Sequence, residues 1–74
     1  MGEVVTFREV KTTYELPGGR IHHIVTGRGG KLVAETFILC DADECREITG
    51  YEFQQLLHKA KVREVRKTEV IRYE

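Results

Sequence analysis

The sequence predicts a single small α+β domain over residues 1–74, and three observations support this fold class. The first 40 residues alternate Val-, Thr- and aromatic-rich stretches with glycine turns, which is typical of antiparallel strands. One amphipathic segment with a marked start follows, and a further strand-like segment ends the chain. With 74 residues, 41% of them apolar, the chain can build a compact but thin core. The predicted element order is β-β-β-α-β.

The first three predicted strands, residues 3–16, 20–26 and 31–40, form a three-stranded antiparallel meander. Pro17-Gly18-Gly19 separates the first two strands, because proline presets φ for a turn and glycine adopts the positive φ that follows. The glycine-rich residues 27–30 form the second turn, with Arg28 at its exposed tip. The apolar alternation of the first strand changes phase, which predicts a bulge near residues 8–9.

The third predicted strand is apolar on both faces, so we expect both of its faces to be covered. Strict alternation divides its side chains into two sets. One face carries Leu32, Ala34, Thr36, Ile38 and Cys40, and the other carries Val33, Glu35, Phe37 and Leu39.

A helix is predicted to begin at Thr49, after an acidic connector over residues 41–47. Thr49 and Glu52 have the spacing of a capping box, and Ile48 and Phe53 have that of a hydrophobic staple. The apolar stripe continues at helical spacing to Ala60, where we expect the helix to end. The stripe consists of Phe53, Leu56, Leu57 and Ala60.

Residues 62–73 are predicted to form the last strand, which carries many charges and suits a sheet edge. A right-handed crossover through the helix places this strand parallel to its neighbour, beside the first strand or the third. The two-sided apolarity of the third strand favours the place beside it. One short helix covers one face only, so the sheet either curls into a small, partly open barrel or presents its other face to another protein.

The residue types favour a protein that is not an enzyme and has no cofactor. The chain contains no serine and no asparagine, which removes serine-nucleophile mechanisms. Cys40 and Cys45 are too few for a secreted disulfide framework, which favours a reducing, cytoplasmic location. Nearby carboxylates disfavour a thiolate at either sulfur. The spacing of these cysteines and of His22 and His23 is poor for zinc, with His22 expected opposite Thr36, so no metal site is predicted.

The chain also lacks the apolar run of a membrane span and the layout of a signal peptide at its start, so no membrane contact is expected. The equal numbers of basic and acidic side chains, 12 each, hide a segregation, because residues 53–74 carry six basic and three acidic groups. Two hypotheses follow from these patterns.

The first hypothesis is a small non-enzymatic binding or regulatory protein, acting as a stand-alone regulator or inhibitor through a protein interface. It includes a homodimer, and the charged last strand offers pairing with a second chain. The alternative is a nucleic-acid-binding domain that uses the basic last strand and the hairpin tip. Its binding residues are Arg28, Arg63, Arg66, Lys67 and Tyr73. Interleaved glutamates make a solvated edge strand the more favoured interpretation of this charge.

Overall fold

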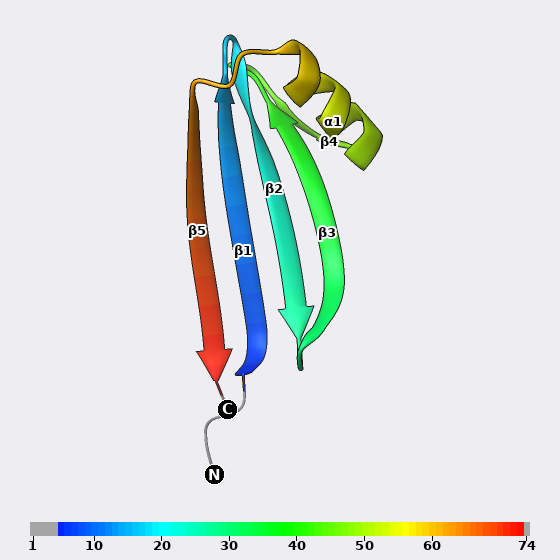
Figure 1. Cartoon of the computed structure of the whole chain (residues 1–74), viewed down its shortest axis with the longest axis vertical. Helices are drawn as coiled ribbons and strands as arrows, with labels where there is room; N and C mark the ends of the chain where they lie inside the picture. Colours follow the sequence, from blue (N-terminus) through cyan, green and yellow to red (C-terminus); the bar gives the residue numbers. More distant parts are fainter. Residues whose placement is uncertain (1–4, 74) are drawn as a thin grey trace.

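A computed structural model of the chain describes residues 5–73, and these form five strands and one helix around one sheet (Figure 1). The mixed α+β class is therefore confirmed. The sheet is antiparallel, with the spatial order β4-β3-β2-β1-β5. The elements are β1 (Val5–Leu16), β2 (Gly19–Arg28), β3 (Lys31–Cys40), β4 (Cys45–Ile48), α1 (Gly50–Lys59) and β5 (Glu64–Tyr73).

The predicted meander of β1, β2 and β3 is confirmed, including both turns. Leu16 pairs with Gly19, so Pro17 and Gly18 alone make the first turn, and Gly18 has φ +92°. Gly29 and Gly30 make the second turn with φ values of +59° and +78°. Two successive positive φ values are what a type I′ hairpin requires, and glycine adopts them without a steric penalty. Because this turn uses two residues, β2 runs two residues past the predicted end at residue 26.

The strand β4 was not predicted, because residues 41–47 were interpreted as a connector. The Asp41 carboxylate accepts hydrogen bonds from the backbone N–H groups of Asp43 and Glu44, at 2.8 and 2.9 Å. This local turn reverses the chain, and residues 45–48 then pair with β3. Cys40 lies opposite Cys45 in this hairpin, and a disulfide joins them. The interpretation of the two cysteines as separate thiols is therefore wrong.

The last strand is an edge strand, as predicted, but its predicted position is wrong. β5 lies beside β1 and runs antiparallel to it, with Tyr14 opposite Val65. The edge beside β3 is already taken by β4. The added strand also reverses the chain once more, so α1 leads back to the end of the sheet where β1 stops, and β5 starts from there (Figure 1).

The helix α1 is confirmed, with Thr49 as its N-cap. The Thr49 hydroxyl accepts a hydrogen bond from the backbone N–H of Glu52 at 3.1 Å, which satisfies one of the free donors at the helix start. Both staple residues, Ile48 and Phe53, are buried. The helix packs on one face of the sheet through its predicted stripe. The buried cluster consists of Leu16, Ile21, Ile48 and Phe53, with Tyr14, Phe37, Leu39, Leu56, Leu57 and Ala60 packed against it.

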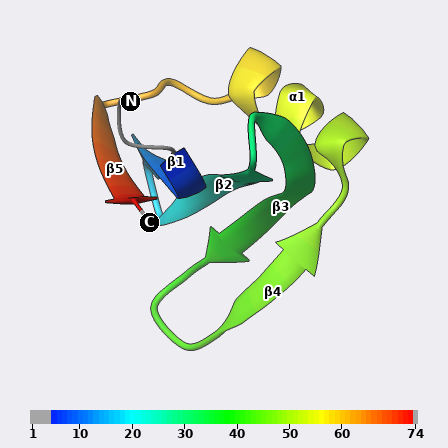
Figure 2. The ribbon, with the colours of Figure 1, turned by 90° about the horizontal axis from the view of Figure 1, so that it is seen from below.

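The described part of the chain measures 48 × 23 × 21 Å, and α1 covers only one end of this long sheet (Figures 1 and 2). We call the half beside the Pro17-Gly18 turn the proximal half, and the half that ends at the Gly29-Gly30 turn the distal half. The order of the described strands leaves two open edges, β4 and β5, and closure into a barrel is not confirmed.

The expectation that β3 is covered on both faces is wrong for its distal half. Residues 31–35 are exposed, whereas residues 36–40 are partly buried, and of these Phe37 and Leu39 pack against the core on the face that α1 covers. A helix of ten residues is about 15 Å long, which is too short for strands of ten to twelve residues. The distal half of the sheet is therefore a single layer among the described residues.

Candidate protein-binding surface

The strand register defines two sheet faces, of which α1 covers one at the proximal end. Tyr14, Ile21 and Leu39 lie opposite one another on this covered face, which we call the helix face. Every second residue along each strand points to the same side. Val10 on β1 and Val25 on β2 therefore continue the helix face into the distal half, where they lie opposite each other.

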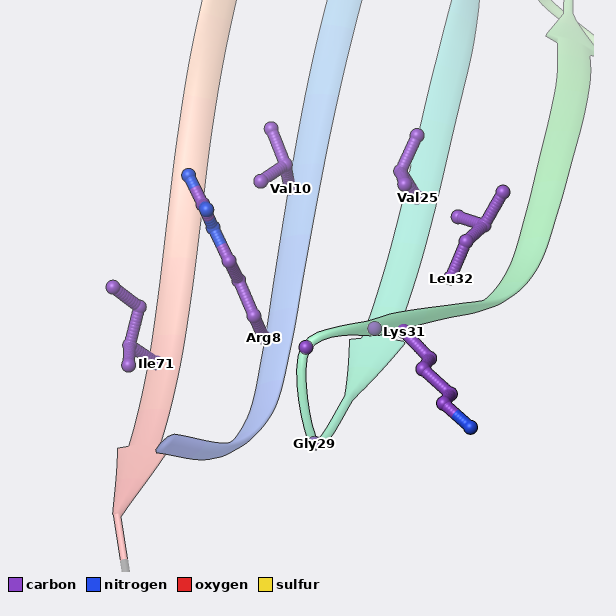
Figure 3. Close-up of a pocket in the computed structure, with 9 residues that line it drawn as sticks. Arg8, Val10, Val25, Gly29, Lys31, Leu32 and Ile71 are labelled. Carbon is purple, nitrogen blue, oxygen red and sulfur yellow. The ribbon is translucent and has the colours of Figure 1, made fainter. Parts of the chain in front are cut away.

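An apolar groove of about 550 Å³ lies on the distal half of the helix face, and we call it the distal groove. Figure 3 shows side chains from four neighbouring strands lining it: Ile71 from β5, Val10 from β1, Val25 from β2 and Leu32 from β3. Glycines 27, 29 and 30 add backbone surface without side chains. Arg8 and Lys31 are the charged residues of its lining.

A bulge in β3 brings Leu32 into this groove. Thr26 pairs with Ala34 but Gly27 pairs with Leu32, so Val33 is an extra residue on β3. The extra residue moves Leu32 to the helix face, whereas strict alternation predicted it on the face of Ala34 and Ile38. Leu32 and Val33 keep 67% and 63% of their surface exposed, so this end of β3 buries little of its apolar content.

The predicted bulge of β1 also lies elsewhere. The irregularity falls between Val5 and Phe7 in the pairing with β5, and the pairing of residues 8–16 with β2 is regular. Arg8 therefore sits in regular sheet on the helix face, opposite Ile71 and Gly27. Its guanidinium donates to the Glu69 carboxylate at 2.6 Å, and this ion pair lies at the β5 side of the distal groove.

The strand β5 exposes apolar and charged side chains along the sheet edge. Val65, Val70 and Ile71 keep 54%, 40% and 39% of their surface exposed. All residues of β5 whose burial is described are exposed. An exposed strand of this length presents a row of unpaired backbone groups to a further strand.

The five residues predicted to bind nucleic acid do not form one surface. Arg28 lies at the distal end of the sheet, beside the Gly29-Gly30 turn, and Tyr73 pairs with Val5 at that end of β5. Arg63 lies at the proximal end, where its guanidinium donates to the Leu16 carbonyl at 2.8 Å. Arg66 and Lys67 are neighbours on one strand, so they point to opposite faces.

Arg66 is also held within the chain. Its guanidinium donates to the Glu15 carboxylate at 2.7 Å, and Arg20 approaches the same carboxylate at 3.5 Å. The backbone of Glu15 accepts from Arg63 N–H at 2.7 Å. Arg63 and Arg66 therefore fasten the start of β5 to the end of β1.

The proximal end of the opposite face contains a histidine beside the disulfide. His22 pairs with Ile38 rather than with Thr36, which places it two residues from Cys40 along β3. Its Nδ1 is 2.9 Å from the Thr13 hydroxyl. Partial burial, followed by the positive charges of Lys11 and Arg20, lowers the pKa of His22. Among residues 5–73, no group of three or more His, Cys, Asp or Glu side chains could hold a metal ion.

His23 belongs to the other face and to the core. Its ring stacks on Phe37 with 4.4 Å between centroids, and it lies 5.5 Å from Phe53. Its Nε2 is 3.0 Å from the Glu35 carboxylate. The two adjacent histidines therefore lie on opposite faces of the sheet, as the alternation of side chains along a strand requires.

Comparisons with protein families, with curated proteins and with solved structures found no match to this chain. In the described part of the chain, no helix has the length and apolar character needed to cross a membrane.

The distal groove was missed at the sequence level, although part of its signal was present. The alternation of β1 and β2 places Val10 and Val25 on one face. Leu32 was assigned to the wrong face because no residue marks the bulge at Val33. Ile71 reaches the groove only because β5 lies beside β1, and the sequence favoured the opposite edge.

Proposed function

We propose that this chain is a non-enzymatic binding protein that acts through a protein–protein interface on the distal half of its helix face. The distal groove carries the proposal, because it is an apolar surface on a sheet face that α1 leaves uncovered. Contiguous exposed apolar surface of this kind is typical of sites where another protein binds.

The arrangement around the groove supports the same function. Apolar side chains from four strands line the groove together with Lys31 and Arg8, and the Arg8 side chain lies between Ile71 and Val10 and pairs with Glu69 (Figure 3). Arginine is enriched in protein interfaces relative to the rest of a protein surface. The groove lies on hydrogen-bonded strands of one sheet, and the pairing of these strands sets the positions of its side chains.

The nucleic-acid alternative gains no support from the positions of the basic residues. Arg28 and Arg63 lie at opposite ends of the sheet, and Arg66 is paired with Glu15. A protein that binds the phosphate backbone of a nucleic acid needs basic side chains along one continuous path. Protein binding is therefore the function that we propose. Nuclease treatment in the experiment below distinguishes it from binding to nucleic acid.

The proposal is tested by mass in solution at micromolar concentration, and by capture from a nuclease-treated cell lysate. We expect the protein to bind another protein through the groove, and Leu32→Glu to lose this binding because it places a charge there. Val62→Glu is the matched control, because Val62 is exposed outside the groove. A strictly monomeric chain that captures no protein, or capture that nuclease abolishes, contradicts the proposal.

A further inference from the structure

The two open edges of the sheet differ greatly in length. On one side the edge is divided between β4, which has four residues, and residues 31–36 of β3, with which β4 does not pair, whereas on the other side β5 presents ten residues without interruption (Figure 1). Short edge strands offer little for another strand to pair with, and long ones offer a full ladder of backbone hydrogen bonds. The β5 edge is therefore where a further strand has most to gain.

Symmetry limits how two copies of β5 pair. Antiparallel neighbours in one sheet are related by a two-fold axis perpendicular to the sheet, which keeps each face on its own side. Residues opposite each other then come from the same face. Each permitted register is therefore centred on one residue of β5, which lies opposite itself.

The register centred on Thr68 gives complementary pairs along the strand. On the helix face, Lys67 lies opposite Glu69 of the second copy, and Val65 lies opposite Ile71. On the opposite face, Glu64 lies opposite Arg72, Thr68 lies opposite itself, and Arg66, which Glu15 already binds within its own chain, lies opposite Val70. Opposite charges and apolar pairs directly across strands stabilise a sheet, and each of these pairs occurs twice by symmetry.

The neighbouring registers lack this complementarity. A centre at Lys67 brings two lysines together and places Val65 opposite Glu69. A centre at Glu69 brings two glutamates together and places Arg66 opposite Arg72. Like charges directly opposite each other destabilise strand pairing. Among these three registers, the charges of β5 therefore favour the one centred on Thr68.

We infer that two copies of this chain pair through β5 in the register centred on Thr68, forming one continuous ten-stranded sheet. This inference rests on the proposed function, because pairing at the β5 edge leaves the distal groove of each copy open and places both grooves on the same face of the joined sheet. It also extends the proposed surface. Ile71 lines the distal groove, and in the dimer Val65 of the second copy lies directly across from it, which continues the apolar surface from one copy to the other.

The contacts inside one chain agree with this pairing. Glu64 lies opposite Glu15 of β1, so its closest cross-strand neighbour within the chain has the same charge. Lys67 has no ion pair among the described residues, and it lies opposite the uncharged Thr12. Glu69 binds Arg8 on its β1 side, which leaves its other side facing the edge. The second copy supplies an opposite charge to each of these side chains.

The test uses two single substitutions and their mixture. Lys67→Glu places glutamate opposite glutamate at two symmetric positions, and Glu69→Lys places lysine opposite lysine. We expect each variant alone to raise the Kd of the dimer about tenfold or more, as measured by sedimentation. Mixed in equal amounts, the two variants form heterodimers with both ion pairs restored, so we expect their mixture to regain wild-type affinity. Lys61→Glu is the control, because it makes the same charge change outside β5.

The register is tested separately by single cysteines at residues 66, 68 and 70 and a short bismaleimide, which leaves the native disulfide unreacted. We expect cross-linked dimer at residue 68 and little at residues 66 and 70. A dimer that cross-links best elsewhere, or one unaffected by either charge variant, overturns this inference while the proposed function stands. A monomer that still captures another protein through the distal groove also overturns the inferred dimer and leaves the proposed function standing. A monomer that captures nothing overturns both.

Discussion

The proximal and distal halves of the sheet share the same four long strands but reach very different degrees of burial. In the proximal half, α1 and β4 enclose Ile21, which is fully buried, together with Leu16 and Phe53. In the distal half, Leu32 keeps 67% of its surface exposed although it lies on the same face. The comparison shows that apolar content alone does not define a core, because a covering element of matching length is also needed.

The largest expected difference between the two halves is in how much unfolding free energy each loses when an apolar side chain is truncated. We expect Ile21→Ala to cost about 3 kcal/mol of unfolding free energy, because it leaves a cavity in packed surroundings. We expect Leu32→Ala to cost about 0.5 kcal/mol or less at dilute concentration, where no partner covers it. Urea unfolding measures both. Equal losses for the two variants mean that the distal half is as well packed as the proximal half.

The disulfide is expected to have the next largest effect, and it lies in the proximal half. Cys40 and Cys45 are separated by five positions, and a loop this short gives about 2 kcal/mol in the chain-entropy model. We expect the double variant Cys40→Ala and Cys45→Ala to lose about this amount, and reductant to destabilise the wild type but not the variant. Thermal unfolding with and without reductant measures it. A wild type indifferent to reductant is evidence against a stabilising disulfide.

The helix cap tests how firmly α1 covers the proximal half. Thr49→Ala removes the acceptor for the Glu52 N–H, and we expect it to lower stability by about 1 kcal/mol. Thr49→Asp keeps an acceptor and adds favourable charge at the helix N-terminus, so it should retain most of the stability. Circular dichroism during urea unfolding compares them. If the alanine variant equals the wild type, the cap does not contribute to holding the helix.

The smallest expected effect is a pH dependence from His22, whose ring is only partly buried. The pKa of His22 in the folded chain is lowered from its ordinary value of 6.5, first by burial and then by Lys11 and Arg20. The unfolded chain therefore binds more protons, and the contribution of His22 is present above pH 6.5 and is lost as the pH falls toward the lowered value. We expect His22→Gln to weaken this loss between pH 7 and 5. If stability falls by the same amount between pH 7 and 5 in the variant and the wild type, His22 is not the source of this loss.

The elements that the sequence predicted best are those with local causes. Pro17-Gly18 and Gly29-Gly30 set their turns through backbone conformation, and Thr49 with Glu52 sets the helix start. Each depends on residues within a few positions of one another. The same residues placed both turns of the meander, although the end of β2 was placed two residues early and His22 was expected opposite Thr36 instead of Ile38.

The errors concern features that depend on distant residues. The short strand β4 forms because β3 offers it a partner, and its charged residues and short length gave no periodic pattern. Once β4 was missed, the direction and neighbour of β5 followed wrongly. The bulge at Val33 depends on the pairing of β3 with β2, and without it Leu32 was assigned to the wrong face. The distal groove needs both features, so the sequence alone could not predict it.

The pairing of β5 with β1 also bears on how the chain folds. Two-residue turns connect the three strands of the meander, so their paired residues are close in sequence. In contrast, Glu9 of β1 pairs with Val70 of β5, which is distant in sequence. Contacts between sequence-distant segments form slowly, since the entropy of closing a long loop must be overcome first. β1 can therefore pair with β2 before β5 reaches it, and until then the outer edge of β1 stays open to any other strand of suitable pattern.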